Sequence, residues 1–571
     1  MVWAPEAHTV ELVTAAGREP LSKAVSGWWL RAEPIAPGTD YRFSLDGADP
    51  LPDPRSPWQP EGPHGPSRAL DHSRFEWSDS GWDPGPLADA VIYECHIGTF
   101  TPEGTFDAAI DRLDHLVELG VTALELLPVA EFPGRRGWGY DGVDLYAPHH
   151  AYGGPDGLKR LIDAAHSRGL AVIVDVVYNH LGPDGNYLGA FAPYFTDRYA
   201  TPWGQALNFD GPDSIQVRSF FIENTLMWLR DYHFDGVRLD AIHAIIDTSA
   251  IHFLEELQDQ VETLQERLGR TLWVIAESDL NDPRVIQRRD RGGFGLDAQW
   301  SDDFHHALHS VLTGETSGYY SDFWSLAQIA KALRNAFVYD GAYSRYRRRV
   351  HGKRPADIPG CRFLGYLQNH DQIGNRAQGE RSSALMTPEL LKVGATLVLT
   401  APFVPMLFQG EEWGASTPFL YFTEHNPELG RLVSEGRKKE FAAFGWDESE
   451  IPDPQDPATF ERSKLDWREL EDPHHADILA WHRDLLRLRR DHPELRDGAM
   501  SEIKIEHHDR ERWIVIEKGS LTIACNLAVE PRSVPLRSER TGRLVLASGK
   551  EPQVENEQAE MAPGSVAIWA P

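Results

Sequence analysis

The sequence has little cysteine and no long apolar run. Its 571 residues include 3 cysteines, Cys95, Cys361 and Cys525, which are far apart and form no C-x-x-C pair. This pattern is typical of reduced intracellular proteins and excludes a disulfide framework. No apolar stretch is long enough to span a bilayer, and Met1–Pro5 lacks the basic and apolar regions of a signal peptide. We therefore expect a cytoplasmic protein without a membrane partner.

Basic charge is also scarce. The chain carries 56 Lys and Arg against 87 Asp and Glu, which gives a formal net charge of −31. Because phosphates would be repelled, this charge argues against a nucleic-acid partner and suits a neutral substrate, although acidity by itself also aids solubility. The 18 tryptophans are consistent with a protein whose aromatic side chains stack on the rings of sugars, although most tryptophans in any protein belong to its core.

The length is too great for one hydrophobic core. Residues 1–73 alternate short apolar and polar runs, as in His8–Val13 and Trp28–Glu33, which predicts a β-sandwich resembling carbohydrate-binding modules. Such a module binds glucan or braces its neighbour, and we favour bracing. We predict an α/β catalytic (β/α)8 TIM barrel over residues 74–490 and a C-terminal antiparallel β domain over residues 491–571. Because the chain opens inside an expected strand, we also expect longer relatives with an earlier strand.

The barrel prediction rests on short apolar strands that alternate with amphipathic helices from Ala90 onward. The eight expected strands are Val91–Tyr93, Val121–Leu127, three that end at Asp175, Asp240 and Glu277, one near residues 298–300, one before Gln368, and Val404–Phe408. The connections after the third and sixth strands exceed ordinary loops. We therefore expect them to build a substrate cleft.

Ionisable residues gather where these strands end. Arg238 and Asp240 lie two apart on one strand, so their side chains share a face. A lone Arg-x-Asp is more often a structural ion pair than a catalytic one. Three further strands lead into Val177–His180, Ala276–Ser278 and Gln368–Asp371, however. A parallel barrel collects its active site at this C-terminal face.

Together these four stretches resemble the signature regions of the α-amylase family of glycoside hydrolases. The resemblance implies that Asp240 is the nucleophile, Glu277 the general acid/base and Asp371 a third carboxylate that distorts the sugar. Retaining glycosidases need two carboxyl groups about 5 to 5.5 Å apart, which adjacent strands could provide. We expect like-charge repulsion to raise at least one pKa while Arg238 keeps Asp240 ionised.

The resemblance also implies a set of sugar contacts. Taken singly, Tyr140 and His180 would as readily be core residues. The predicted substrate-binding residues are Tyr140, Asp175, His180, Arg238, His243, His370 and Tyr320. Many amylases bind calcium at the position of Asn179, but no further calcium ligands are recognisable. His305, His306 and His309 lack a carboxylate or cysteine to complete a metal site, so we predict no metal and no cofactor.

Several longer runs resemble those members of the family that release trehalose from maltooligosyltrehalose. These runs are Ala241–Leu254, Ile275–Asp282, Trp300–His306, Gly318–Tyr320 and Leu367–Arg376. Ser278 departs from the pattern, which favours Asn there, and the resemblance weakens in the C-terminal domain. It implies an oligosaccharide substrate and a pathway with the synthase that makes maltooligosyltrehalose.

Three alternatives remain open. They are a 1,4-α-glucan branching enzyme, a general α-amylase and a catalytically inactive glucan-binding scaffold. The catalytic carboxylates cannot tell a leaving trehalose from a leaving maltose, so discrimination must come from the product side. Candidate groups are Tyr319, Tyr320 and the basic run 345–349, whose arginines could equally form a solvated face.

Overall fold

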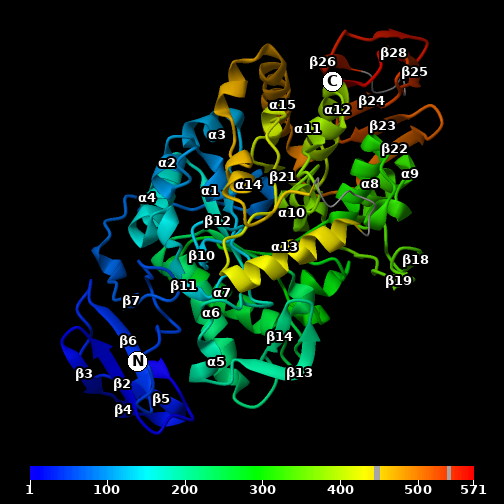
Figure 1. Ribbon diagram of the computed structural model, residues 1–571. Coiled ribbons are helices and arrows are strands. Elements are labelled where there is room, and N and C mark those ends of the chain that lie inside the picture. Colours follow the sequence, from blue (N-terminus) through cyan, green and yellow to red (C-terminus); the bar gives the residue numbers. More distant parts are fainter. Residues whose placement is uncertain (443–450, 537–541) are drawn as a thin grey trace.

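The computed structural model describes residues 1–442, 451–536 and 542–571 (Figure 1). A central barrel lies between antiparallel sheets at the two ends of the molecule. The N-terminal strands, blue in Figure 1, and the C-terminal strands, red, are at opposite ends. Within the described ranges, no helix is long and apolar enough to cross a membrane.

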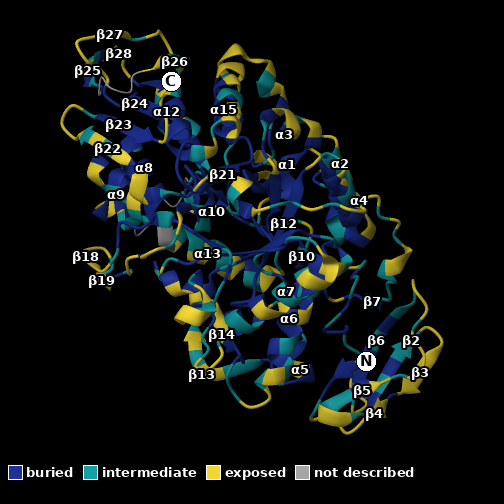
Figure 2. Cartoon of the chain, turned by 180° about the vertical axis from the view of Figure 1, so that it is seen from behind, coloured by how far each residue is buried: buried dark blue, intermediate teal, exposed yellow. Residues whose placement is uncertain are grey.

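Eight parallel strands close into a barrel, which confirms the predicted (β/α)8 fold. They are β8 (Ile92–Cys95), β9 (Ala123–Leu126), β12 (Ala171–Val176), β15 (Gly236–Leu239), β16 (Trp273–Ala276), β17 (Ala298–Trp300), β20 (Phe363–Gly365) and β21 (Val404–Phe408). Their residues are apolar in near-continuous runs because helices cover the outside of a parallel barrel. The strands are accordingly buried, dark blue in Figure 2.

The alternation of side chains along each strand positions the chemistry. Residues such as Ile173, Trp273 and Met406 pack in a separate core cluster inside the barrel. The same alternation continues along each strand toward its C-terminal end, where it reaches Asp175 on β12 and Arg238 on β15, which are paired in register. The upper layer of the barrel is therefore charged where the lower layer is apolar.

The helices follow the strands around the barrel. The longer ones are α4 (Gly154–His166), α6 (Ser214–Asp231), α7 (Phe253–Leu268), α8 (Asp302–Thr313), α9 (Leu326–Asn335), α12 (Pro388–Leu399), α13 (Pro427–Ala442) and α15 (Pro473–Asp491). The helical region between β8 and β9 is divided into α2 (Phe106–Ile110) and α3 (Leu113–Leu119). The break lets both pieces bury their apolar faces, and Gly120 ends α3 with a φ of 102°.

The flanking sheets are antiparallel. The N-terminal strands are β1 (Val2–Trp3), β2 (Val10–Thr14), β3 (Gly17–Pro20), β4 (Ser22–Lys23), β5 (Trp28–Leu30), β6 (Asp40–Leu45) and β7 (Ser67–Arg68). The C-terminal strands are β22 (Lys504–His508), β23 (Trp513–Lys518), β24 (Leu521–Asn526), β25 (Arg532–Pro535), β26 (Arg543–Ala547), β27 (Gln553–Glu555), β28 (Gln558–Met561) and β29 (Ser565–Ala570). The division into domains at residues 73 and 490 stays a prediction.

Four connections extend beyond the C-terminal ends of the strands. One carries the pair β10 (Ala130–Glu131) and β11 (Asp144–Pro148), and another carries β13 (Phe195–Thr201) and β14 (Gly204–Leu207). After β17 the chain forms α8 at once, so the excursion expected after strand six follows that helix and contains β18 (Ala342–Ser344) and β19 (Arg349–His351). A fourth connection, after β21, includes α13, and neither it nor the connection after β9 was among the long ones expected.

Candidate active site

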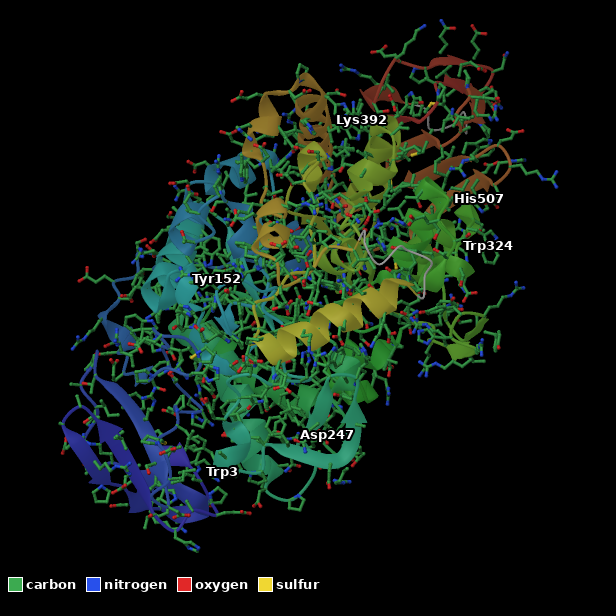
Figure 3. All side chains as sticks on the ribbon, viewed as in Figure 1. Trp3, Tyr152, Asp247, Trp324, Lys392 and His507 are labelled. Atoms are coloured by element: carbon green, nitrogen blue, oxygen red, sulfur yellow. The ribbon has the colours of Figure 1, made fainter. Side chains whose placement is uncertain are left out.

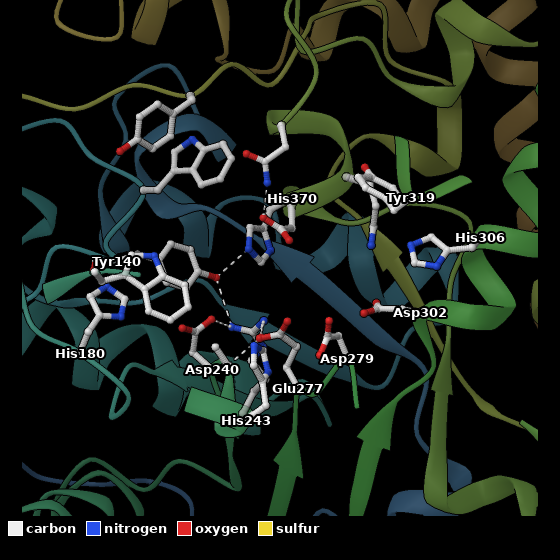
Figure 4. Close-up of a pocket in the computed structure, with 18 of the residues that line it drawn as sticks. Tyr140, His180, Asp240, His243, Glu277, Asp279, Asp302, His306, Tyr319 and His370 are labelled. Carbon is white, nitrogen blue, oxygen red and sulfur yellow. Dashed lines mark hydrogen bonds and ion pairs between the residues drawn. The ribbon is translucent and has the colours of Figure 1, made fainter. Parts of the chain in front are cut away.

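A cavity of about 560 Å³ opens at the C-terminal ends of the barrel strands. It is lined by Trp138, Tyr140, Asp141, His180, Trp203, Arg238, Asp240, Ala241, His243, Glu277, Asp279, Asp302, His306, Tyr319, Tyr346, Arg347, His370, Asp371, Gln372, Asn375 and Tyr421. In Figure 4, Asp240 and Glu277 lie between Tyr140 and His180 on one side and Asp302 and Tyr319 on the other. The three predicted catalytic carboxylates therefore meet in one cleft.

Arg238 lies at the floor of this cavity and contacts three carboxylates. Its Nη1 lies 2.5 Å from Asp175 Oδ2 and 3.0 Å from Asp240 Oδ1, and its Nη2 lies 3.2 Å from Glu277 Oε2. The guanidinium also sits over the ring of Trp300 at 4.3 Å. A buried cation shared in this way fixes the carboxylates of neighbouring strands relative to one another. The structure therefore contains the ion pair between Arg238 and Asp240 that the sequence predicted.

Asp240 and Glu277 are also linked through the backbone. Ala241 has a φ of 39°, in the left-handed region that alanine rarely adopts. In this conformation its N–H donates a 2.6 Å hydrogen bond to Glu277 Oε2. The strain of a non-glycine residue in this region is of the kind that clusters at functional sites. Here it aims a backbone donor at the predicted acid/base.

The pKa of Glu277 is raised well above its ordinary value. Burial is the largest cause, and repulsion from Asp240, Asp302 and Asp371 adds to it, while Arg238 opposes the shift. Like-charge repulsion thus contributes as expected but is secondary to burial. A carboxyl group whose pKa is raised is suited to general acid catalysis.

A chain of hydrogen bonds connects Asp175 to Glu94 through Tyr140 and His370, which line the cavity. The Tyr140 hydroxyl donates to Asp175 Oδ2 at 2.6 Å and lies 2.8 Å from His370 Nε2. His370 Nδ1 in turn lies 2.5 Å from Glu94 Oε1. Burial disfavours a charged ring, but Glu94 outweighs it and raises the pKa of His370. Burial also raises the pKa of Asp175 to about 6, against the opposing effect of Arg238.

Tyr140 reaches this position because of the glycine before it. Gly139 has a φ of 100°, and a Cβ there would lie 2.3 Å from the carbonyl oxygen of Pro128. Only glycine fits this close approach. His180 supports the same loop from the other side, since its Nε2 lies 3.0 Å from the carbonyl oxygen of Tyr140. The ring of His180 stacks on Trp203, with ring centroids 4.8 Å apart.

Asp371 lies at the open side of the cavity. It is exposed at the start of α10 (His370–Gly374), and Asn375 donates a 2.6 Å hydrogen bond to its Oδ1. Asn369 caps this helix by accepting from the N–H groups of Asp371 and Gln372. The cap fixes the direction in which Asp371 leaves the backbone. A carboxylate exposed in this way is available to sugar hydroxyls.

The opposite wall comes mainly from the chain between α8 and β20. Arg347 Nη1 donates to Asp279 Oδ2 at 2.8 Å. Burial raises the pKa of Asp302 to about 7, and the Tyr366 hydroxyl bonds to that carboxylate. Tyr319, Tyr346 and Arg347 all line the cavity, as does the predicted residue His243.

Tyr320 lies elsewhere than expected. Its side chain is buried, its hydroxyl is 2.9 Å from His305 Nε2, and its ring stacks on His309 with centroids 4.4 Å apart. The cavity lining contains Tyr319 instead. The two neighbouring tyrosines point differently, so Tyr320 supports the wall and does not form its surface. Asp175 likewise lies beneath the lining, where it contacts Arg238 and Tyr140.

The histidines considered for a metal site have other partners. His305 Nδ1 is 2.8 Å from the carbonyl oxygen of Leu367, and His309 Nε2 is 2.7 Å from Glu315 Oε2. Asn179, at the position where many amylases bind calcium, donates to Asp240 Oδ2 at 2.7 Å. These groups therefore serve protein hydrogen bonds in this structure.

Sequence reasoning missed several residues of the site. Glu94, Trp203, Asp302 and Tyr421 all contact or line it. Glu94 and Asp302 stand within or next to expected strands, and the alternation that points Asp175 inward also applies to them. That alternation was the available signal for these two. Trp203 and Tyr421 lie on long connections whose course a single sequence does not reveal.

The closed barrel and the carboxylates at its C-terminal face place the chain in the α-amylase class of glycoside hydrolases. A family model described as the alpha amylase catalytic domain matches residues 72–196. A malto-oligosyltrehalose trehalohydrolase from Arthrobacter ramosus is 51% identical over 96% of this chain and 95% of that protein. Another, from Mycobacterium tuberculosis, is 47% identical over 99% of this chain and 98% of that protein. The chain belongs to the malto-oligosyltrehalose trehalohydrolase family.

Structural comparison agrees with this assignment. The crystal structure of a candidate alpha amylase from Salmonella typhimurium superposes with a TM-score of 0.91 at 39% identity, covering 100% of this chain and 97% of that one. A 1,4-alpha-glucan branching enzyme from Corynebacterium jeikeium is more distant, with 29% identity over 72% of this chain and 60% of its own.

Proposed function

We propose that this chain hydrolyses the α-1,4 bond between a maltooligosaccharide and its terminal trehalose unit, releasing trehalose. The observation that carries the proposal is the joint placement of Asp240 and Glu277 on one buried guanidinium, that of Arg238. Two carboxyl groups held together, one of them with a raised pKa, suit a retaining glycosidase. Family membership supports the choice of substrate.

The reaction follows from the roles of the two groups. Asp240 attacks the anomeric carbon as Glu277 gives its proton to the leaving glycosidic oxygen, which departs as the hydroxyl of trehalose. Glu277, now ionised, takes a proton from water, whose oxygen displaces Asp240 and restores the carboxylate. Two inversions leave the configuration retained. Asp371 accepts hydrogen bonds from sugar hydroxyls as the ring distorts.

The remaining predicted residues hold the sugar at the cleavage site. Tyr140 offers the stacking face, and His180 and His370 flank it, each holding Tyr140 through one ring nitrogen. Asp175 acts from beneath by orienting Tyr140 and Arg238. Trp203 extends the aromatic surface, since the residue is 48% exposed. Sugar rings present apolar faces that pack well on such rings.

Trehalose is selected by the wall that contains Asp279, Tyr319, Tyr346 and Arg347. The ion pair of Arg347 with Asp279 supplies fixed polar groups beside the acid/base strand. A leaving group that fails to pair such groups is rejected more strongly than shape alone allows. His243 lies on the same cavity and contributes a further donor or acceptor.

The chain acts after a synthase that makes maltooligosyltrehalose, and it does so in the cytoplasm. The three cysteines support this compartment because all are free. The alternatives fit less well. A branching enzyme must exclude water and hold a second glucan, and the branching-enzyme relative is more distant than the trehalohydrolases. An inactive scaffold would not need the complete carboxylate set.

Product analysis tests the proposal. The protein is incubated separately with maltooligosyltrehalose, maltopentaose and amylose, and the products are separated and identified. We expect trehalose and the shortened maltooligosaccharide from the first substrate, formed faster than any product of the other two. Branched products would indicate transfer, and random shortening of amylose would indicate a general amylase. Binding without turnover would indicate a scaffold.

A further inference from the structure

A second cluster of ionisable groups lies at the base of the loop that carries Tyr140. Glu131 ends β10, while His149 and His150 follow β11, the strand that pairs with it. Glu131 Oε1 lies 3.2 Å from His149 Nδ1 and 2.8 Å from His150 Nδ1. One oxygen and two nitrogens thus converge, all within 4.8 Å of one another.

These spacings are close to those of a metal site. Zinc binds imidazole nitrogen and carboxylate oxygen at about 2.0 to 2.2 Å, so ligand atoms at tetrahedral angles lie about 3.3 Å apart. Two of the three separations, 3.2 and 2.8 Å, differ from that spacing by only about 0.5 Å or less. A small outward movement of His150 would admit an ion. Its side chain is 19% exposed, which gives access from solvent.

A further buried carboxyl group, that of Asp144, lies on the neighbouring strand. Asp144 faces Glu131 across the β10–β11 pair. Its Oδ2 is buried and has no hydrogen-bond partner. Burial, together with the charges of Glu131 and Asp53, raises the pKa of Asp144 well above its usual range. Burial therefore favours the neutral form of Asp144, which lies outside the group of three convergent ligand atoms.

The surroundings hold the histidine rings in place. His149 is stacked on Phe132, with ring centroids 3.8 Å apart, and meets Tyr152 edge to face at 4.8 Å. The backbone N–H of His150 donates to Glu131 Oε2, which orients the carboxylate. Tyr152, labelled in Figure 3, marks this region beside α4. The donor atoms are therefore largely pre-positioned.

We propose that Glu131, His149 and His150 bind one divalent cation of the zinc class. Two imidazoles and a carboxylate favour zinc, cobalt or nickel over calcium and magnesium. The ion joins the end of β10 to the residues that follow β11, and the chain between them contains Trp138 and Tyr140. Its role is to stabilise that segment. It lies outside the set of residues that line the catalytic cavity.

Metal binding to the whole protein tests this inference. Protein freed of metal with a chelator is titrated with Zn²⁺ in competition with a chromophoric chelator. We expect one tight ion per chain, with affinity reduced at least tenfold in His150→Asn and in Glu131→Gln. His474→Asn is the control, because His474 is exposed beside His475 and could bind zinc only adventitiously. Weak binding that this control abolishes would overturn the proposal.

Two further readouts separate a true site from a folding defect. Co²⁺ added to the metal-free protein should give the intense visible absorption of tetrahedral coordination, and His150→Asn should lose it while keeping the native circular dichroism spectrum. Zn²⁺ should raise the Tm of the unaltered protein and leave that of His150→Asn unchanged. Equal zinc affinity in His150→Asn and the unaltered protein, or no tight ion in either, would contradict the assignment.

Discussion

Asn179 donates a 2.7 Å hydrogen bond from its Nδ2 to Oδ2 of Asp240. The same nitrogen also bonds the carbonyl oxygen of Asp240 at 2.9 Å. An amide that contacts both the side chain and the backbone of one residue limits how far that residue can rotate. Asn179 therefore positions the predicted nucleophile, together with Arg238 on the other carboxylate oxygen.

Asn179→Ala should lower kcat/KM on maltooligosyltrehalose by roughly 10- to 150-fold, because a hydrogen bond to a charged group contributes about 1.5 to 3 kcal/mol. Steady-state kinetics measure the effect. Asn186→Ala is a matched control on the same connection, since Asn186 caps the backbone N–H of Leu188. Similar losses in both variants would show that the effect is not specific to Asp240.

Replacing either catalytic carboxylate should nearly abolish turnover. Glu277→Gln keeps the shape of the side chain but removes the transferable proton, which is worth about 10² to 10⁴ in rate. Asp240→Asn should be at least as damaging because it removes the nucleophile. Single-turnover rates measure both, with Tm as a check on folding. Near-normal turnover in either folded variant would refute the assigned roles.

Asp302 offers a test of how the proton of Glu277 is retained. Above its own pKa of about 7 it is charged, and its charge is one cause, after burial, of the raised pKa of Glu277. Asp302→Asn removes a negative neighbour and so lowers the pKa of Glu277. The alkaline limb of kcat/KM against pH should therefore move to lower pH.

Asp290→Asn is the control, because Asp290 is exposed and bonds Arg288. The pH profiles of the control and the unaltered protein should coincide. An alkaline limb in Asp302→Asn that stays in place, or moves to higher pH, would show that Asp302 does not influence Glu277.

A buried histidine at the other end of the barrel gives a prediction for stability. His166 Nδ1 lies 2.9 Å from Asp79 and its Nε2 lies 2.9 Å from Asp235. Burial lowers the pKa of His166, but these two carboxylates outweigh it, so the folded pKa is raised. The stabilisation is thus complete below the unfolded pKa of about 6.5 and is lost as pH rises through the folded value.

His166→Gln should therefore cost more stability at about pH 6 than at about pH 9. Midpoints of urea unfolding across this range measure the difference from the unaltered protein. His8→Gln, at an exposed position, should shift the urea midpoint only slightly, and by the same amount across this pH range. A loss in His166→Gln that does not depend on pH would mean that the histidine acts through packing alone.

Some residues of this site could be predicted from local patterns in the sequence, and others could not. Arg238, Asp240 and Glu277 were predictable because strand alternation and a parallel barrel bring such residues to one face. Tyr319 and Tyr320 could not be separated, because a 3-10 turn at residues 318–322 decides which ring faces the cavity. The role of Asn179 depends on a contact with a residue 61 positions away in the chain, which no local pattern encodes.

The selecting wall can be tested through Arg347. Arg347→Ala removes the partner of Asp279 and should reduce the preference for maltooligosyltrehalose, by roughly the 1 to 3 kcal/mol that one specific contact is worth. The rate on plain maltooligosaccharide should change little because the catalytic carboxylates are untouched. Arg345→Ala, in the same run but exposed, is the control. An unchanged preference in Arg347→Ala would place the selection elsewhere.

The central claim is that this chain recognises the terminal trehalose unit. The most direct measurement is the ratio of kcat/KM for maltooligosyltrehalose to kcat/KM for a maltooligosaccharide of equal length, with trehalose release assayed in the same reactions. We predict a ratio well above roughly tenfold, since polar groups left unpaired by the wrong leaving group oppose its binding. A ratio near one in the unaltered protein would contradict the proposed substrate, although membership of the α-amylase class would stand.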